Sequence, residues 1–129
     1  MRSVVFCGSR RFKKEMRAFG AALRKKGVLV FEPYLHSGQD EWVSLSKEYQ
    51  NFVALGLTHD HFYKIKLADV VFIFNKDGYV GASTTLELGY ALACAKPVYA
   101  LHLDEELCRN VLFRDVLDTP SKLFKILKS

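Results

Sequence analysis

The first 31 residues hold two short apolar runs with a glycine turn and a helical pattern between them. The first run, residues 3–7, ends at Gly8, and the second run, residues 28–31, follows Gly27. From residue 12 to residue 26, apolar side chains recur at helical spacing. A strand, a turn, a helix and a second strand in this order form a βαβ unit, whose two strands run parallel. This opening therefore predicts an α/β protein built on a parallel sheet.

Two later apolar runs extend the predicted sheet. Residues 70–74 have the pattern of a fully buried strand, and residues 97–101 form another, after a helix that we expect over residues 81–95. Thr119 followed by Pro120 is typical of a helix start, so we expect a short terminal helix there. These elements predict a three-layer α/β domain of the Rossmann or flavodoxin-like class, with a four- to five-stranded parallel sheet.

The segment from residue 34 to residue 68 divides less clearly into elements. Residues 34–41 are polar and predict an irregular connection, whereas residues 42–57 are compatible with a helix. Thr58 has the residue type of an N-cap, and Asp60 would then lie in the first turn of a separate helix, near the positive end of its dipole. The side chains expected on the inner face of the earlier helix are Val43, Tyr49, Phe52 and Val53.

Length and composition limit the class of protein. A chain of 129 residues corresponds to one domain, spanning residues 1–129, and its 50% hydrophobic and 26% charged residues are typical of a folded globular protein. No apolar run is long enough to cross a bilayer, and the apolar stretch at the N-terminus is too short for a signal peptide. We therefore expect a cytoplasmic protein without a membrane partner.

The three cysteines are widely spaced and form no CxxC pair, which predicts reduced thiols. We expect them to serve as small buried apolar side chains, and only Cys7 is a candidate for a reactive thiol. The sequence predicts neither a metal site nor a cofactor. No metal-ligand spacing links the four histidines, which are His36, His59, His61 and His102.

The net charge of +5 favours an anionic partner. The basic residues are scattered, however, and many of those in the first expected helix fit a solvated face. No helix-turn-helix, zinc-finger or RNP pattern is present, which argues against nucleic-acid binding. A small anionic ligand is therefore the expected partner.

The carboxyl ends of the strands are where ligands bind in an open parallel sheet. The turn after the first expected strand holds Gly8, Ser9 and Arg10, where backbone N–H groups, a hydroxyl and a guanidinium would converge. Such a set suits a phosphate or sugar hydroxyls. It is equally consistent with a tight turn that carries a solvated arginine.

A second turn rich in glycine and hydroxyl groups, residues 78–85, follows the strand at residues 70–74. We expect Ser83 to cap the helix that begins there. Glu87 stands out because it would lie in the first turn of a helix whose other residues are mostly apolar. Thr84 and Glu87 also have the spacing of a capping box, a purely structural role that stays open at this point.

The segment Glu87-Leu88-Gly89-Tyr90-Ala91 resembles the E-x-G-x-A motif of the nucleoside 2-deoxyribosyltransferases and of the related 2′-deoxynucleoside 5′-monophosphate N-glycosidases. The likeness runs from residue 4 to residue 101 and includes the opening strand, the glycine-serine turn and two later strands. A small uncharacterised group of bacterial and archaeal proteins resembles the chain more closely. The segments that carry this second likeness are residues 7–13, 61–69 and 77–87.

This resemblance implies cleavage of an N-glycosidic bond. Glu87 would attack the anomeric carbon as the nucleophile and form a covalent glycosyl–enzyme intermediate, which water or a second nucleobase would then resolve. His61 stands where the classical enzymes carry an acidic residue, and it could donate a proton, contact the leaving base, orient the ligand or cap a helix. Gly81 stands where the transferases commonly carry aspartate and the monophosphate N-glycosidases carry serine.

The resemblance also implies a homodimer or larger homo-oligomer and a set of substrate contacts. An aromatic side chain such as Phe12, Tyr34 or Tyr79 could stack on a base, although core packing is an equal explanation for each. The expected substrate-binding residues are Gly8, Ser9, Arg10, Phe12, Asp60, Gly78, Tyr79, Gly81, Ser83 and Thr84.

Three functions fit these observations. The favoured one is an N-glycosidase or deoxyribosyltransferase-like enzyme that acts on a nucleoside or a nucleoside 5′-monophosphate. The alternative is a non-catalytic module that binds or senses a nucleotide in the same pocket. An interaction protein that uses the basic surface is the third.

Overall fold

The computed structural model describes residues 1–35 and 39–129, and its sheet has four parallel strands in the order β2-β1-β3-β4. The strands are β1 (Val4–Cys7), β2 (Val30–Phe31), β3 (Val70–Ile73) and β4 (Val98–Ala100). The predicted parallel α/β fold is confirmed. A fifth strand does not form in the described residues, because Val116 makes only an isolated parallel bridge to Ala100.

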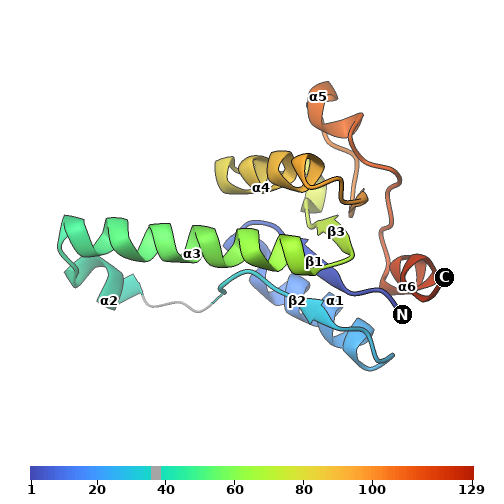
Figure 1. Ribbon diagram of the computed structural model, residues 1–129, viewed down its shortest axis with the longest axis horizontal. Coiled ribbons are helices and arrows are strands. Elements are labelled where there is room, and N and C mark those ends of the chain that lie inside the picture. The colour runs from blue at the N-terminus through green and yellow to red at the C-terminus, as the bar shows by residue number, and fades with distance from the viewer. Residues whose placement is uncertain (36–38) are drawn as a thin grey trace.

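Helices cover both faces of this sheet and make the three layers (Figure 1). On one face, α1 (Lys13–Arg24) and α6 (Pro120–Lys128) bury apolar side chains against Phe6 and Phe72. On the other face, α3 (Lys47–Leu67) and α4 (Ala82–Ala93) pack on alternate strand residues such as Cys7 and Ile73. The strands are buried on both faces, which is why they read as continuous apolar runs.

The remaining elements are short. Two 3₁₀ turns, η1 (Arg10–Phe12) and η2 (Lys76–Gly78), follow β1 and β3, and α5 (Leu107–Asn110) follows β4. The predicted cap of the terminal helix is confirmed, because the Thr119 hydroxyl accepts a hydrogen bond from the Lys122 N–H. None of the described helices is both long and apolar enough to cross a membrane.

The predicted helix boundary at Thr58 is wrong. A single helix, α3, runs through this residue, and its N-cap is Ser46, whose hydroxyl accepts a hydrogen bond from the Tyr49 N–H. The Thr58 hydroxyl instead donates a hydrogen bond of 2.7 Å to the Ala54 carbonyl. A threonine can satisfy its hydroxyl in this way inside a helix, so residue type alone does not mark a helix start.

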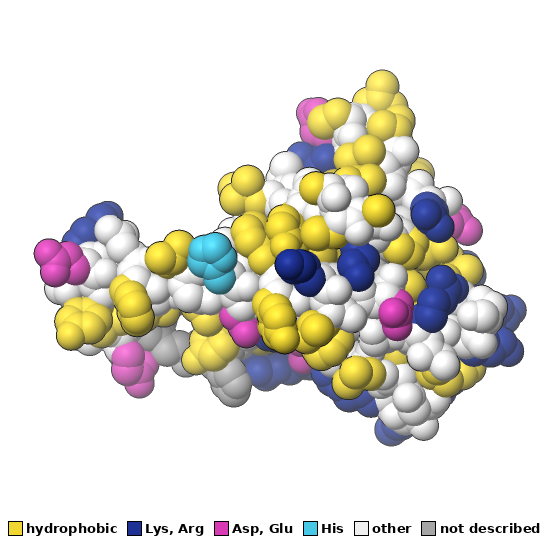
Figure 2. Space-filling view, in the orientation of Figure 1, with side chains coloured by type: hydrophobic (Ala, Val, Ile, Leu, Met, Phe, Trp, Pro, Cys, Tyr) yellow, Lys and Arg dark blue, Asp and Glu magenta, His cyan; other side chains and the backbone are white. Residues whose placement is uncertain are grey.

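Three of the four side chains predicted on the inner face of residues 42–57 are exposed, whereas the fourth, Val53, is half-buried as expected. The helix α2 (Gln39–Ser44) and the first half of α3 project from the sheet as an arm (Figure 1), which we call the α2–α3 arm and define as residues 39–57. Figure 2 shows hydrophobic side chains along this arm, where Val43, Tyr49 and Phe52 are 66%, 64% and 73% exposed. The expected irregular segment at residues 34–41 ends in α2, and its residues 36–38 lie outside the described residues.

Candidate active site

A cavity of about 1490 Å³ opens between the carboxyl edge of the sheet and the α2–α3 arm. Three parts of the chain line it: the turn after β1, the inner side of α3 and the start of α4. This is where the topology of a parallel sheet predicts a ligand site. The cavity is larger than most small-molecule sites, which range from about 300 to 1,000 Å³.

The cavity floor brings together Cys7, His61 and Glu87, one residue each from β1, α3 and α4. The Nε2 atom of His61 lies 3.3 Å from Cys7 Sγ and 3.7 Å from Glu87 Oε2. Cys7 is fully buried, His61 is 4% exposed, and the Glu87 side chain is 14% exposed. His61 and Glu87 line the cavity, so a bound molecule could contact both.

Burial shifts the titration of both cavity-lining members of this cluster. It raises the pKa of Glu87 to about 7, and it lowers the pKa of His61 to about 4, with a smaller contribution from the Lys64 ammonium. Between these two values neither side chain is charged, so the contact of 3.7 Å is not an ion pair there. Glu87 is ionised only above about pH 7.

The predicted place of Glu87 in the first turn of its helix is wrong. Gly81 is the N-cap residue of α4, so Glu87 lies in the second turn, beyond the reach of most of the helix dipole. Neither Ser83 nor Thr84 caps the helix, because the N-cap position is occupied by Gly81 and no side chain caps this helix. Without Thr84 at the N-cap, Thr84 and Glu87 form no capping box. The predicted structural roles of Ser83 and Thr84 are therefore wrong, and Glu87 needs another explanation.

Of the three cysteines predicted to be buried, only Cys7 is, since Cys94 is half-buried and Cys108 is exposed. The contact of Cys7 with His61 was not predicted. Burial raises the pKa of the Cys7 thiol well above its usual value, with a smaller contribution from the Glu87 carboxylate, so the thiol stays protonated at neutral pH. Nucleophilic chemistry at this cysteine is disfavoured. The Nδ1 atom of His61, on the other side of the ring, is buried and makes no hydrogen bond of good geometry with the described residues.

The glycine turn after β1 forms the second polar part of the cavity. The Ser9 hydroxyl accepts a hydrogen bond of 3.2 Å from the Arg11 N–H and so caps η1. Gly8 is required by close packing, because a Cβ atom there would lie 2.9 Å from the Phe74 carbonyl oxygen. Arg10 and Lys13 line the cavity, and neither is paired with an acidic group in the described part of the chain.

Most of the predicted binding residues line the cavity, namely Gly8, Ser9, Arg10, Tyr79, Gly81, Ser83 and Thr84. Phe12 does not, because it is buried in the core with its ring 6.0 Å from that of Tyr79. Asp60 is paired at 2.9 Å with Lys64 on the outside of α3, and Gly78 lies in η2. The Tyr79 ring is covered on one face by the Arg11 guanidinium, at 3.6 Å from the ring centroid.

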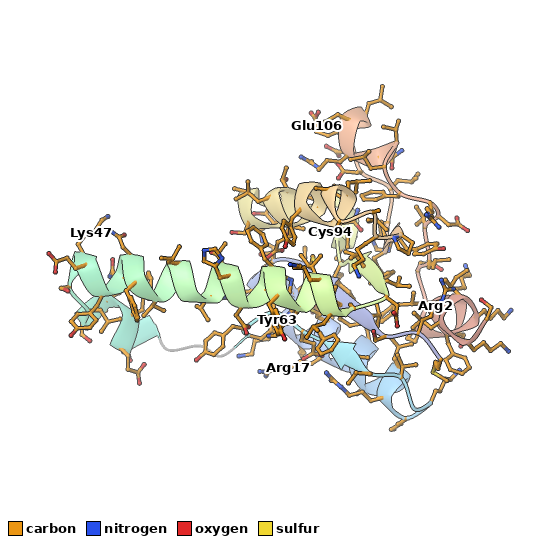
Figure 3. The ribbon with its side chains drawn as sticks, in the orientation of Figure 1. Arg2, Arg17, Lys47, Tyr63, Cys94 and Glu106 are labelled. Atoms are coloured by element: carbon orange, nitrogen blue, oxygen red, sulfur yellow. The ribbon has the colours of Figure 1, made fainter. Side chains whose placement is uncertain are left out.

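The arm supplies a cavity wall of which the sequence predicted only Val53 as an inward-facing residue. Figure 3 shows Lys47, the first residue of α3, at the far end of the arm, away from the sheet. Nearer the sheet, the cavity wall is mainly apolar. The wall residues from the arm and from the segment after β2 include Leu35, Trp42, Leu45, Val53, Ala54 and Leu57. Their helical spacing was visible, but what they face depends on the direction of the arm.

Comparisons with known proteins identify the fold. The chain superimposes on the 2-deoxyribosyltransferase from the psychrotolerant bacterium Bacillus psychrosaccharolyticus with a TM-score of 0.61 and 19% identity, over 94% of this chain and 89% of that chain. A conserved protein from Enterococcus faecalis V583 gives a TM-score of 0.64 and 15% identity, over 99% and 98%. No protein-family model and no curated protein sequence matches the chain. The chain therefore has a nucleoside 2-deoxyribosyltransferase-like fold, as its motifs predicted.

Proposed function

We propose that the protein cleaves or transfers the N-glycosidic bond of a nucleoside or nucleoside 5′-monophosphate, with Glu87 as the nucleophile. The observation that carries this proposal is a mostly buried carboxyl group on the floor of a large cavity, at the carboxyl edge of a 2-deoxyribosyltransferase-like fold. A carboxyl group buried without a cation costs stability, so its presence there favours a chemical role.

The reaction proceeds in two steps. In the first, a Glu87 oxygen attacks the anomeric carbon, the carbon–nitrogen bond breaks, and its electron pair leaves with the base, which takes up a proton. In the second, water or another base attacks the same carbon and displaces Glu87, and the attacking group loses a proton. The second step regenerates the free carboxylate, and because each displacement inverts the anomeric carbon, the sugar ends with its original configuration.

His61 acts mainly as a positioning residue in this proposal. Its pKa of about 4 leaves the imidazole uncharged at neutral pH, which makes it a poor proton donor to the leaving base. Its Nε2 atom faces Glu87 at 3.7 Å and can hold the carboxylate toward the cavity. The proton for the base then comes from solvent or from the substrate itself.

Two cations that form no ion pair with a described residue favour a phosphorylated substrate. Arg10 and Lys13 line the cavity beside the Ser9 turn, where the Ser9 hydroxyl can also donate a hydrogen bond to a phosphate oxygen. Tyr79 is held by Arg11 and offers its other face to a base. A nucleoside 5′-monophosphate thus matches the side chains of the site.

We further propose that the protein works as a homodimer or larger homo-oligomer in the cytoplasm. The α2–α3 arm exposes Tyr49, Phe52 and Leu55, at 64%, 73% and 59%. A second copy that covers these side chains would remove apolar surface from water.

One observation favours the alternative of a non-catalytic nucleotide-binding module. With a pKa of about 7, about half of the Glu87 side chains carry a proton at neutral pH, and a neutral carboxyl group is no nucleophile. The same cavity and cations would then bind a nucleotide without cleaving it.

Release of free base distinguishes the two functions. The protein is incubated with a panel of ribo- and deoxyribonucleosides and their 5′-monophosphates, and free base is measured by chromatography. The variants Glu87→Gln and Glu87→Ala run beside it, with Glu105→Gln as a matched control, because Glu105 is exposed and does not line the cavity. Release by the wild type and by Glu105→Gln, but not by the Glu87 variants, supports the enzyme. Monophosphate binding by calorimetry without release from any substrate supports the binding module.

A further inference from the structure

We propose that Cys7, His61 and Glu87 form a reversible inhibitory site for a thiophilic divalent cation, and that Zn²⁺ is the ion it fits best. Binding of the ion depends only on the three side chains. Its inhibitory effect rests on the proposed function, because the ion would occupy the nucleophile.

The distances in the cluster fit tetrahedral coordination. One ligand atom from each residue lies within 4.8 Å of the other two, and the two contacts to His61 Nε2 measure 3.3 Å and 3.7 Å. Zinc bonds of about 2.3 Å to sulfur and about 2.0–2.2 Å to nitrogen or oxygen place neighbouring ligands about 3.3–3.6 Å apart in a tetrahedron. Small side-chain adjustments would therefore seat the ion.

The fourth coordination position would point into the cavity. His61 and Glu87 both line the cavity, whereas Cys7 closes the site from below as a fully buried residue. Water, or an oxygen of a bound molecule, can reach an ion held in this way. Three protein ligands with one open position are the usual arrangement where zinc is accessible to water or a bound molecule.

The ligand types select the metal. A thiolate and an imidazole are soft and borderline ligands, which favour Zn²⁺ over the oxygen-seeking ions Mg²⁺ and Ca²⁺. When Zn²⁺ binds, the S–H bond of Cys7 breaks, a Zn–S bond forms, and the proton leaves to solvent without any redox change. A protonated Glu87 loses its proton in the same way.

The surroundings of His61 favour reversible binding. A zinc-bound histidine normally donates its second ring N–H to a carbonyl or carboxylate, which orients the ring and strengthens the site. Here Nδ1 makes no hydrogen bond of good geometry with the described residues, although the Phe6 backbone lies close to the ring. We therefore expect weaker binding than at a structural zinc site, and removal of the ion by a chelator.

Inhibition is expected because the ion and the sugar compete for the same carboxylate, that of Glu87. The Glu87 carboxylate that would attack the anomeric carbon is also the group that would bind the ion. A carboxylate shared with Zn²⁺ is a weaker nucleophile, and the ion would also occupy the space that the sugar needs. Low concentrations of free Zn²⁺ should thus stop base release, and a chelator should restore it.

Direct metal binding to the chelator-treated protein tests the proposal. Co²⁺ is titrated first, because a thiolate bound to Co²⁺ gives a charge-transfer band in the near ultraviolet, and Zn²⁺ should then abolish this band by displacement. The Zn²⁺ affinity is measured by calorimetry for the wild type, Cys7→Ser, Cys7→Ala, Glu87→Gln and the control Cys108→Ser. Cys108 is exposed and lies outside the cluster. Circular dichroism shows which variants fold.

The expected result is one ion per chain, with the band present in the wild type and in Cys108→Ser. Folded Cys7 variants should lose the band, and each cluster variant should lose at least about tenfold in Zn²⁺ affinity. A band that persists in the Cys7 variants, or an affinity that the cluster variants leave unchanged, would overturn the site. If neither Cys7 variant folds, Glu87→Gln decides by the loss or retention of Zn²⁺ affinity.

The two proposals fail in different ways. If the cobalt band depends on Cys7 but the protein releases no base, the enzymatic function is refuted and the metal site is supported. If the protein releases base that Zn²⁺ does not inhibit, and shows no cobalt band, the metal site is refuted and the enzymatic function is supported.

Discussion

The Nε2 atom of His61 lies 3.7 Å from Glu87 Oε2, in a part of the protein from which water is largely excluded. Burial acts on the two groups in opposite directions, since it raises the pKa of the acid and lowers the pKa of the base. The pair therefore does not behave as a salt bridge near neutral pH. What decides the chemistry is whether Glu87 has lost its proton.

Activity should rise with pH through the pKa of Glu87. Only the ionised carboxylate can attack, and burial raises its pKa to about 7, so in metal-free buffer kcat/KM should fall about tenfold per pH unit below 7 and level off above it. Rate measurements from pH 5 to pH 9 with a chelator present check this. A flat profile between pH 5 and pH 7 would show that Glu87 does not titrate there or does not act.

The variant His61→Asn should lower kcat without moving the pH midpoint. The amide is uncharged, as the imidazole is at neutral pH, so the pKa of Glu87 should stay near 7 because burial causes its shift. Loss of the contact to Glu87 should reduce kcat by about 10–100-fold, less than the loss of a general acid can cost. Loss of the pH transition in this variant would instead identify His61 as the titrating group.

Removal of the cavity cations should discriminate between phosphorylated and unphosphorylated substrates. In each of the variants Arg10→Ala and Lys13→Ala, we expect KM for a 5′-monophosphate to rise about tenfold, which corresponds to about 1.4 kcal/mol of binding free energy. The KM for the unphosphorylated nucleoside should change little. Lys14→Ala is the matched control, since Lys14 is exposed and does not line the cavity. Equal effects on both substrates would argue against a phosphate contact.

Position 8, in the turn after β1, should tolerate no side chain larger than that of glycine. A Cβ atom at Gly8 would meet the Phe74 carbonyl oxygen at 2.9 Å and Met16 Cε at 2.8 Å, so Gly8→Ala should lower the free energy of unfolding by about 1–3 kcal/mol. The control is Gly56→Ala inside α3, where no atom lies within 4 Å of the added Cβ. The free energy of unfolding of Gly56→Ala should rise by about 1 kcal/mol, because alanine has a higher helix propensity than glycine. Urea unfolding compares the two, and a neutral Gly8→Ala would refute the close packing.

Much of the fold was predictable because a strand buried on both faces leaves a continuous apolar run. Residues 70–74 and the opening βαβ unit showed this pattern, and the structure has a strand or helix at each place. The capped terminal helix at Thr119 was equally local, since residue type and the following proline specify it. Predictions of this kind succeed because they depend only on residues that are close in the sequence.

The arm and the cluster were not predictable in the same way. Helical spacing does not tell whether Tyr49 and Phe52 face the sheet or solvent, and here both are exposed on a helix that extends beyond the sheet. The contact of Cys7 with His61 requires β1 to lie centrally in the sheet and α3 to cover it. Glu87 was found by its motif, but its raised pKa follows from burial that the sequence did not reveal.

The central claim is that Glu87 becomes covalently bound to the sugar. Mass spectrometry of the protein, quenched in acid during turnover of a nucleoside 5′-monophosphate that it cleaves, tests this most directly. We predict an added mass equal to the sugar phosphate without its base, located on the peptide that contains Glu87 and absent from Glu87→Gln. Base release with no such adduct, or with an adduct on another residue, would contradict the account.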